Sequence, residues 1–201
     1  MYKVKVISLK RRQDRREKIS HMFQHVPFEF VDAIDGKEYK LTAYDKKMIE
    51  GNEYEKHGIH IPSLVCANYM HLNLLDECAN QPKEEAVPYF IFEDDVYLNE
   101  ELKAPDEMFE TLASVNNLDA FWLITKVPSV GAYIVWPSGA KIMKNYIIRK
   151  AKLKRGLDWS FWNLRNSGKL RVDQLKDSYF GHNPGEDSDI TTLENYDISS
   201  N

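Results

Sequence analysis

Three adjacent carboxylates, Glu93, Asp94 and Asp95, offer the clearest chemistry in this sequence. They end an apolar run at residues 89–92, which is typical of a strand buried on both faces. Neighbouring carboxylates repel one another unless a cation or solvent compensates their charge. Mn²⁺ and Mg²⁺ prefer oxygen ligands and often join one or two carboxylates to substrate phosphates. Since ligands of open α/β sheets bind at the carboxyl ends of strands, the pattern indicates a metal–diphosphate site.

The three carboxylates of this acidic triplet are expected to point in two different directions. Successive residues of a strand alternate between its faces, so we expect Glu93 and Asp95 to point one way and Asp94 the other. The plainer interpretation is a solvated acidic turn, in which Asp94 or Asp95 accepts hydrogen bonds from nearby backbone N–H groups. Both interpretations fit the residues.

A basic segment at residues 10–16 follows the first expected strand and enters a helix. Helix N-termini attract anions and arginine pairs well with phosphate, so Arg11 and Arg15 are candidates for contacts with a phosphorylated ligand. The alternative is a solvated helix face whose arginines pair partly with Asp14 and Glu17, which stabilises a helix only modestly.

The segment at residues 32–36 ends the second expected strand with two aspartates and a glycine. An aspartate in this place can accept hydrogen bonds from ribose hydroxyls, and Asp32 is favoured over Asp35 for that role. The pair Asp35-Gly36 can also form a side-chain-closed turn without any ligand.

Two further residues are candidates on their own. Asp158 stands beside Trp159, Phe161 and Trp162, and a carboxylate in apolar surroundings can act as a base while the aromatic rings stack on a sugar. The alternative for this group is helix capping and core packing. His182 can supply a neutral imidazole to manganese, although a lone histidine is more often a surface residue.

The elements that must position these residues alternate between strands and helices. Residue pattern and turn signals predict strands at 2–9, 28–32, 89–92, 121–124 and 132–136. Helices are expected at 12–23, 63–78, 137–149 and 157–164, with further starts at Thr42 and Pro105. The tail from Gly181 is polar and expected to be irregular. The alternation predicts one α/β domain over residues 1–201, with a twisted, mostly parallel sheet flanked by helices.

Composition narrows the class of protein. The net charge of -4 argues against a general nucleic-acid binder. Cys66 and Cys78 fall on the apolar side of one expected helix, so we expect buried thiols. The first residues read as a strand and no apolar stretch is long enough for a bilayer, which favours the cytoplasm. The basic stretch at 141–155 allows peripheral contact with an anionic membrane, but a core helix with a solvated basic face is favoured.

Several segments together resemble glycosyltransferase family 25, whose bacterial members build lipooligosaccharide and whose animal relatives galactosylate collagen. Residues 6–16, VISLKRRQDRR, are similar to its opening strand and basic signature, and residues 30–36, FVDAIDG, to its "DA-x-DG" segment. Residues 89–96, YFIFEDDV, resemble its acidic motif. Later segments at 131–135, 139–141, 157–159 and 188–190 follow in the family's order.

This resemblance implies a GT-A-like, Rossmann-like fold and a nucleotide-sugar donor. It implies donor contacts from Leu9, Arg11, Arg15, Asp32, Ala33 and Asp94. It implies a metal, Mn²⁺ or Mg²⁺, held by Glu93 and Asp95 with His182 completing the shell, and Asp158 as the catalytic base. One region differs from the family: its Gly-Cys and Ser-His elements appear here as Cys66-Ala67 and Met70-His71.

The expected activity is metal-dependent transfer of a hexose, galactose or glucose, from a UDP-sugar to a glycan hydroxyl, with inversion. The partners are then a UDP-sugar donor and an oligosaccharide or glycoconjugate acceptor. Two other functions stay open at this point. One is a metal-dependent phosphoryl-transfer enzyme, against which stands the absence of a second clear ligand motif for a two-metal site. The other is a non-catalytic module that binds a nucleotide sugar or carbohydrate.

Overall fold

The structure, a computed structural model, describes residues 1–51, 58–98, 105–124, 129–150, 156–174, 180–182 and 189. Of residues 105, 106, 149, 150 and 182 it describes the backbone alone. Its strands are β1 Lys3–Ser8, β2 Glu29–Asp32, β3 Tyr89–Glu93, β4 Val96–Leu98, β5 Ala120–Trp122, β6 Ala132–Val135, β7 Val172–Gln174 and β8 Phe180–His182. Its helices are α1 Gln13–Met22, α2 Ala43–Met48, α3 Ile61–Ala79, α4 Pro105–Ala113, α5 Pro137–Lys150 and α6 Gly156–Asn166, with a 3-10 turn η2 at Lys83–Glu85.

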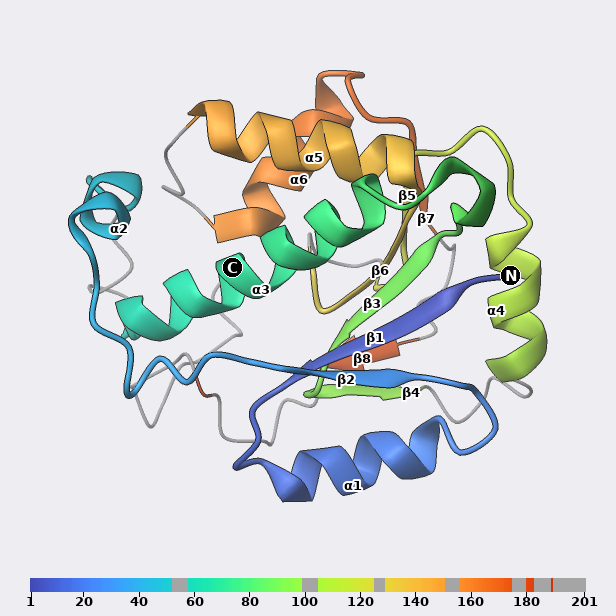
Figure 1. The fold of residues 1–201 in the computed structure, drawn as a ribbon, viewed down its shortest axis with the longest axis horizontal. Coiled ribbons are helices and arrows are strands. Elements are labelled where there is room, and N and C mark those ends of the chain that lie inside the picture. The colour runs from blue at the N-terminus through green and yellow to red at the C-terminus, as the bar shows by residue number, and fades with distance from the viewer. Residues whose placement is uncertain are drawn as a thin grey trace.

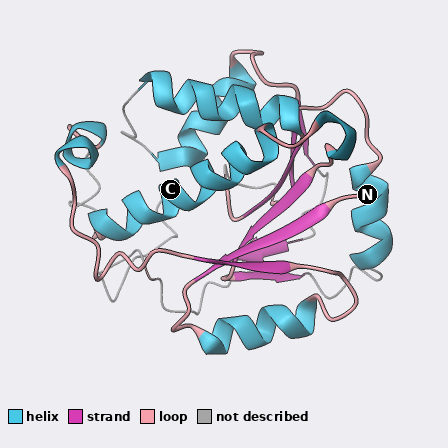
Figure 2. Ribbon diagram, in the orientation of Figure 1, coloured by secondary structure: helices cyan, strands magenta, loops and turns pink. Residues whose placement is uncertain are grey.

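Six strands form the main sheet in the order β2-β1-β3-β6-β5-β7 (Figure 1). The pairs β1–β2, β1–β3 and β5–β7 are parallel, whereas β6 runs antiparallel to both of its neighbours. This mostly parallel sheet between helices confirms the predicted α/β fold class (Figure 2). That residues 1–201 make a single domain stays a prediction.

Alternation along the strands divides the core into two layers. On β3, Phe90 and Phe92 pack with α1 and α4, while Tyr89 and Ile91 pack with α3, α5 and α6. All four side chains are fully buried because helices cover both faces of the sheet, which explains the continuous apolar run. Figure 1 shows α1 on one side of the sheet and α3, α5 and α6 on the other.

The register of the parallel strands places their carboxyl ends together. Ser8 at the end of β1 lies opposite Asp32 of β2, and Ile7 lies opposite Glu93 of β3. The segments that leave β1, β2 and β3 therefore start at the same edge of the sheet, which is where ligands of such folds bind.

Two expectations from the sequence need comment. The tail from Gly181 was expected to be irregular, but Gly181 and His182 belong to β8, which pairs antiparallel with β4. The backbone N–H and C=O groups of β4 form this pairing, which no side-chain pattern in the sequence predicts. The two cysteines are free and buried as predicted, and burial raises the pKa of Cys66 to about 11 and that of Cys78 to about 12.

Among the described residues no helix is both long enough and apolar enough to cross a membrane. On α5, Ala140, Met143 and Ile147 face the core while Lys141 is exposed. Lys144 pairs with Asp76 of α3. The described part of this basic stretch is therefore a core helix whose exposed positions include Lys141 and Ile148.

Candidate active site

A pocket of about 100 Å³ opens where β1, β2 and β3 end. Ser8 and Leu9 line it from the end of β1, and Ala33 and Gly36 from the segment after β2. The rest of the lining comes from Ser63 and Ala67 of α3, the acidic triplet at the end of β3, Arg15 of α1 and Asp189. Besides Leu9 and Ala33, four predicted site residues line this pocket, namely Arg15, Glu93, Asp94 and Asp95.

The acidic triplet enters this pocket as a turn. β3 ends at Glu93, and Asp94 and Asp95 form a turn before β4. All three residues line the same pocket. Glu93 contacts His71 of α3 and Asp94 pairs with Arg15 of α1, and these two helices lie on opposite sides of the sheet (Figure 1). Glu93 and Asp94 therefore point in different directions, as alternation along a strand predicts, and the direction of Asp95 stays a prediction.

Arg15 and Asp94 form an ion pair inside the pocket. Arg15 Nη1 donates to Asp94 Oδ1 at 2.8 Å, and only 5% of the Arg15 and 11% of the Asp94 side chain is exposed. Burial raises the pKa of Asp94, while Ser8 and Arg15 oppose that rise by favouring the carboxylate. Arg15 is therefore no part of a solvated helix face, since its guanidinium is held against the pocket.

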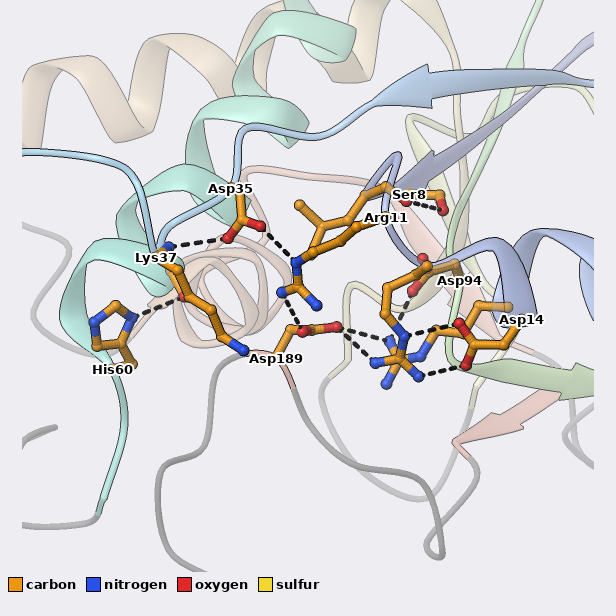
Figure 3. A network of polar contacts seen from close by, with 12 residues as sticks. Ser8, Arg11, Asp14, Asp35, Lys37, His60, Asp94 and Asp189 are labelled. Carbon is orange, nitrogen blue, oxygen red and sulfur yellow. Dashed lines mark hydrogen bonds and ion pairs between the residues drawn. The ribbon is translucent and has the colours of Figure 1, made fainter.

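Three guanidinium groups of the basic segment converge on Asp189 (Figure 3). Asp189 accepts from Arg11 Nη2 at 2.5 Å and from Arg12 Nη1 at 2.8 Å, and its Oδ2 lies 3.8 Å from Arg15 Nη1. Arg11 Nε also donates to Asp35 at 2.5 Å, and this contact lowers the pKa of Asp35. Guanidinium groups that bind a carboxylate in this way are equally suited to phosphate oxygens.

Asp32 and Gly36 take different places in the segment after β2. Asp32 pairs with Arg16 at 2.8 Å and Lys10 at 3.0 Å, and these contacts lower its pKa. It lies next to Ala33 of the pocket wall rather than on that wall itself. Asp35 Oδ1 accepts from the backbone N–H of Lys37 at 2.9 Å, the ligand-free turn that the sequence allowed.

Position 36 has room for a glycine but not for a larger residue. A methyl group at Gly36 would lie 2.3 Å from the Cα atom of Ser63, where α3 begins. Only glycine lets the segment after β2 pack this closely on α3, so the two walls of the pocket are fixed together.

The comparison with protein families fits this arrangement. The model of glycosyltransferase family 25, described as an LPS biosynthesis protein, matches residues 1–127. The chain belongs to glycosyltransferase family 25. Its activity is accordingly the transfer of a sugar from a donor to a glycan acceptor. Among solved structures it is similar to a glycosyltransferase involved in the glycosylation of the major capsid of PBCV-1, with 13% identity, a TM-score of 0.49, and coverage of 90% of this chain and 92% of that chain. No curated protein matches the chain.

The family match includes Arg15 and the acidic turn of this glycosyltransferase, and Asp158 and His182 lie beyond it. Asp158 stands near the start of α6, where its Oδ1 accepts from the backbone N–H of Val130 at 2.6 Å. It is not among the residues that line the pocket. Its proposed role as base stays a prediction.

His182 is placed through its backbone. In the β4–β8 pair it lies opposite Val96, which directly follows Asp95. The strand pairing therefore brings its backbone beside the acidic turn, although its side chain lies outside the described residues.

A metal ion at this site would be held by Glu93 and Asp95. Within the part of the chain that the structure describes, no three His, Cys, Asp or Glu side chains are grouped to hold a metal. Glu93 and Asp95 fit the pattern of one or two carboxylates completed by substrate phosphates, which Mg²⁺ and Mn²⁺ commonly adopt. Their oxygen atoms are the right donors for either ion.

Sequence reasoning missed three residues of this family 25 site. Ser8 lines the pocket, and Asp189 pairs with arginines of the basic segment. His71 Nε2 lies 3.1 Å from Oε1 of Glu93. Ser8 and Asp189 lie inside recognised family segments, so their position was a usable signal. His71 shared a helix face with apolar residues, which favoured a packing role.

Proposed function

We propose that this chain transfers a hexose from a UDP-sugar to a hydroxyl group of a glycan, with Glu93 and Asp95 holding Mn²⁺ or Mg²⁺. The observation that carries the proposal is the shared pocket of the acidic turn and Arg15 at the carboxyl ends of three strands. A bound metal would stabilise the negative charge on the leaving diphosphate. Galactose is the sugar that the resemblance favours, and the fold is proposed to be of the GT-A type.

Other residues of the chain are proposed to bind the donor and to activate the acceptor. Asp94 fixes the guanidinium of Arg15 at 2.8 Å, so that Arg15 is preorganised for a phosphate oxygen. Arg11 lies beside it for a further phosphate contact. Leu9 and Ala33 form the wall against the nucleoside, and Asp32 is proposed to orient the ribose. Asp158 would take the proton of the acceptor hydroxyl in an inverting transfer, with His182 as a further metal ligand. A peripheral contact of α5 with an anionic membrane belongs to the same proposal.

Release of UDP from a panel of UDP-sugars, with and without Mn²⁺, tests this function. Asp95→Asn should lower metal-dependent release by about 100-fold or more, because metal stabilisation of the transition state contributes several kcal/mol. Asp173→Asn is the matched control, since this exposed aspartate on β7 lies outside the pocket. Release that is independent of metal, or unaffected in Asp95→Asn, would contradict the metal–diphosphate site.

A further inference from the structure

A buried polar chain leads from the core of the protein to the pocket. His71 of α3 is 1% exposed and Tyr133 of β6 is fully buried. His71 Nδ1 lies 3.2 Å from the Tyr133 hydroxyl, and His71 Nε2 lies 3.1 Å from Oε1 of Glu93. Glu93 is the member of this chain that reaches the pocket.

The partners decide the direction of these hydrogen bonds. An ionised Glu93 has acceptors only, so His71 Nε2 carries the hydrogen and donates it. In a neutral imidazole Nδ1 is then an acceptor, and the Tyr133 hydroxyl donates to it. Burial raises the pKa of Tyr133 well above its ordinary value, so the phenol keeps the proton that it donates. Each polar group thus finds a partner, and one tautomer of His71 is selected.

Packing alone does not require this arrangement. The surrounding core cluster contains Met70, Leu74 and Leu75 of the same helix. An apolar side chain at position 71 together with phenylalanine at position 133 would extend this cluster without the two buried polar groups. Polar groups buried from water need hydrogen bonds to offset the cost of desolvation. The contacts of His71 and Tyr133 meet that requirement, and they end on a carboxylate of the pocket.

We propose that His71 and Tyr133 are positioning residues, which hold Glu93 in the orientation that the metal–diphosphate site needs. This inference rests on the proposed function, because it assigns Glu93 to that site. His71 fixes Oε1 of Glu93, and Oε2 would then be available to the metal. Such partners of a ligand typically change metal affinity or activity by about 10- to 100-fold when they are removed.

Two substitutions at position 71 separate positioning from packing. His71→Leu fills the space but cannot donate, whereas His71→Gln offers an amide N–H in place of Nε2. The measurement is the Kd of Mn²⁺ in the presence of saturating UDP by calorimetry, together with kcat and the KM for the donor. We expect His71→Leu to weaken Mn²⁺ binding by about 10- to 100-fold. His71→Gln should restore most of that affinity, and Tyr133→Phe should weaken binding less than His71→Leu, because His71 keeps its contact with Glu93.

Stability is measured alongside, with Cys78→Ala as the control. Cys78 is fully buried on the same helix and in the same core cluster, so its truncation should lower stability and leave the Mn²⁺ affinity unchanged. If His71→Leu does not fold, the double variant His71→Leu/Tyr133→Phe removes both polar partners and leaves no unpaired group. It should then fold and show the same loss of affinity.

The outcomes separate a failure of the positioning role from a failure of the proposed function. If the native protein binds Mn²⁺ with UDP and Asp95→Asn does not, the proposed function stands. Wild-type affinity in His71→Leu would then overturn the positioning role alone, as would a folded His71→Gln that binds no better than His71→Leu. If the native protein itself binds no Mn²⁺ with UDP, both proposals fail.

Discussion

At the scale of single residues, burial decides what a charge can do. Arg15 and Arg16 are neighbours on α1, yet Arg15 is buried beside Asp94 in the pocket and Arg16 pairs with Asp32 outside it. The sequence shows five basic residues in a short segment but does not indicate which of them reaches the pocket, because that depends on which side chains the helix turns toward β3. In the structure Arg15 is the one of the five that lines the pocket.

Arg15→Lys should raise the KM for the donor by about tenfold or more. Lysine keeps the positive charge but loses the planar fork that can contact Asp94 and a phosphate together, and hydrogen bonds to charged groups contribute about 1.5–3 kcal/mol. Steady-state kinetics against the UDP-sugar measure this change. Arg165→Lys is the control, since Arg165 of α6 donates to Gln174 of β7 and does not line the pocket. An unchanged KM in Arg15→Lys would remove Arg15 from the donor site.

Asp158 allows a test of the catalytic base that preserves its contact with the backbone. In Asp158→Asn the side-chain oxygen can still accept from Val130 N–H, so the fold should be retained. If Asp158 is the base, kcat should fall by about 10²- to 10⁴-fold while stability changes little. Asp158→Ala removes the backbone contact as well and should lose stability too. Full activity in Asp158→Asn would leave Asp158 with a structural role only.

At the scale of elements, segments with an apolar run or a helical spacing were predictable, whereas three short strands without such a pattern were not. The buried run of β3 and the helical spacing of α3 gave both elements from the sequence, and Thr42 begins α2 with the expected capping box. The strands β4, β7 and β8 have three residues each, too few to show a period. They form because a partner strand is present, and that partner is distant in the sequence.

The capping box of α2 also predicts a pH dependence of stability. Asp45 is fully buried and accepts from Thr42 N–H and Oγ1, both at 2.7 Å, from Tyr39 at 2.9 Å, and from Tyr69. Burial raises its pKa, but the hydrogen bonds outweigh this and lower the pKa below the ordinary 3.8. Because the folded-state pKa is the lower one, ionised Asp45 stabilises the fold above pH 3.8 and this contribution is lost as the pH falls through the folded-state value.

Asp45→Asn should therefore destabilise the protein by about 1–3 kcal/mol at pH 7, since an amide has one acceptor oxygen in place of two. The difference from the native protein should shrink as the pH is lowered toward 3. Urea unfolding at both pH values measures the two free energies. Exposed Asp173→Asn serves as the control and should change stability little at either pH. A difference that stays constant with pH would contradict the role of the ionised carboxylate.

At the scale of the whole molecule, the site arises from the alignment of strand ends. The sequence places Leu9, Ala33 and Glu93 each just after or at the end of an apolar segment, which predicts a common edge but no pocket. The pocket further depends on the register of Ser8 with Asp32 and on the close packing of Gly36 against Ser63. Both are relations between distant segments, so they could not be read from the order of the residues.

Because this pocket joins three strands, α1 and α3, a ligand that fills it should stabilise the whole fold. UDP with Mn²⁺ at about 100 times its Kd should add about 2.7 kcal/mol, which corresponds to a rise in Tm of about 5–10 °C for a chain of this length. Thermal unfolding with UDP alone should give a smaller rise, since the diphosphate then lacks the cation between it and Glu93 and Asp95. Asp95→Asn should respond to UDP but gain nothing further from Mn²⁺, whereas Asp173→Asn should respond as the native protein does. Equal rises in Tm with and without Mn²⁺ would show that the nucleotide binds without the metal, and the acidic turn would then need another role.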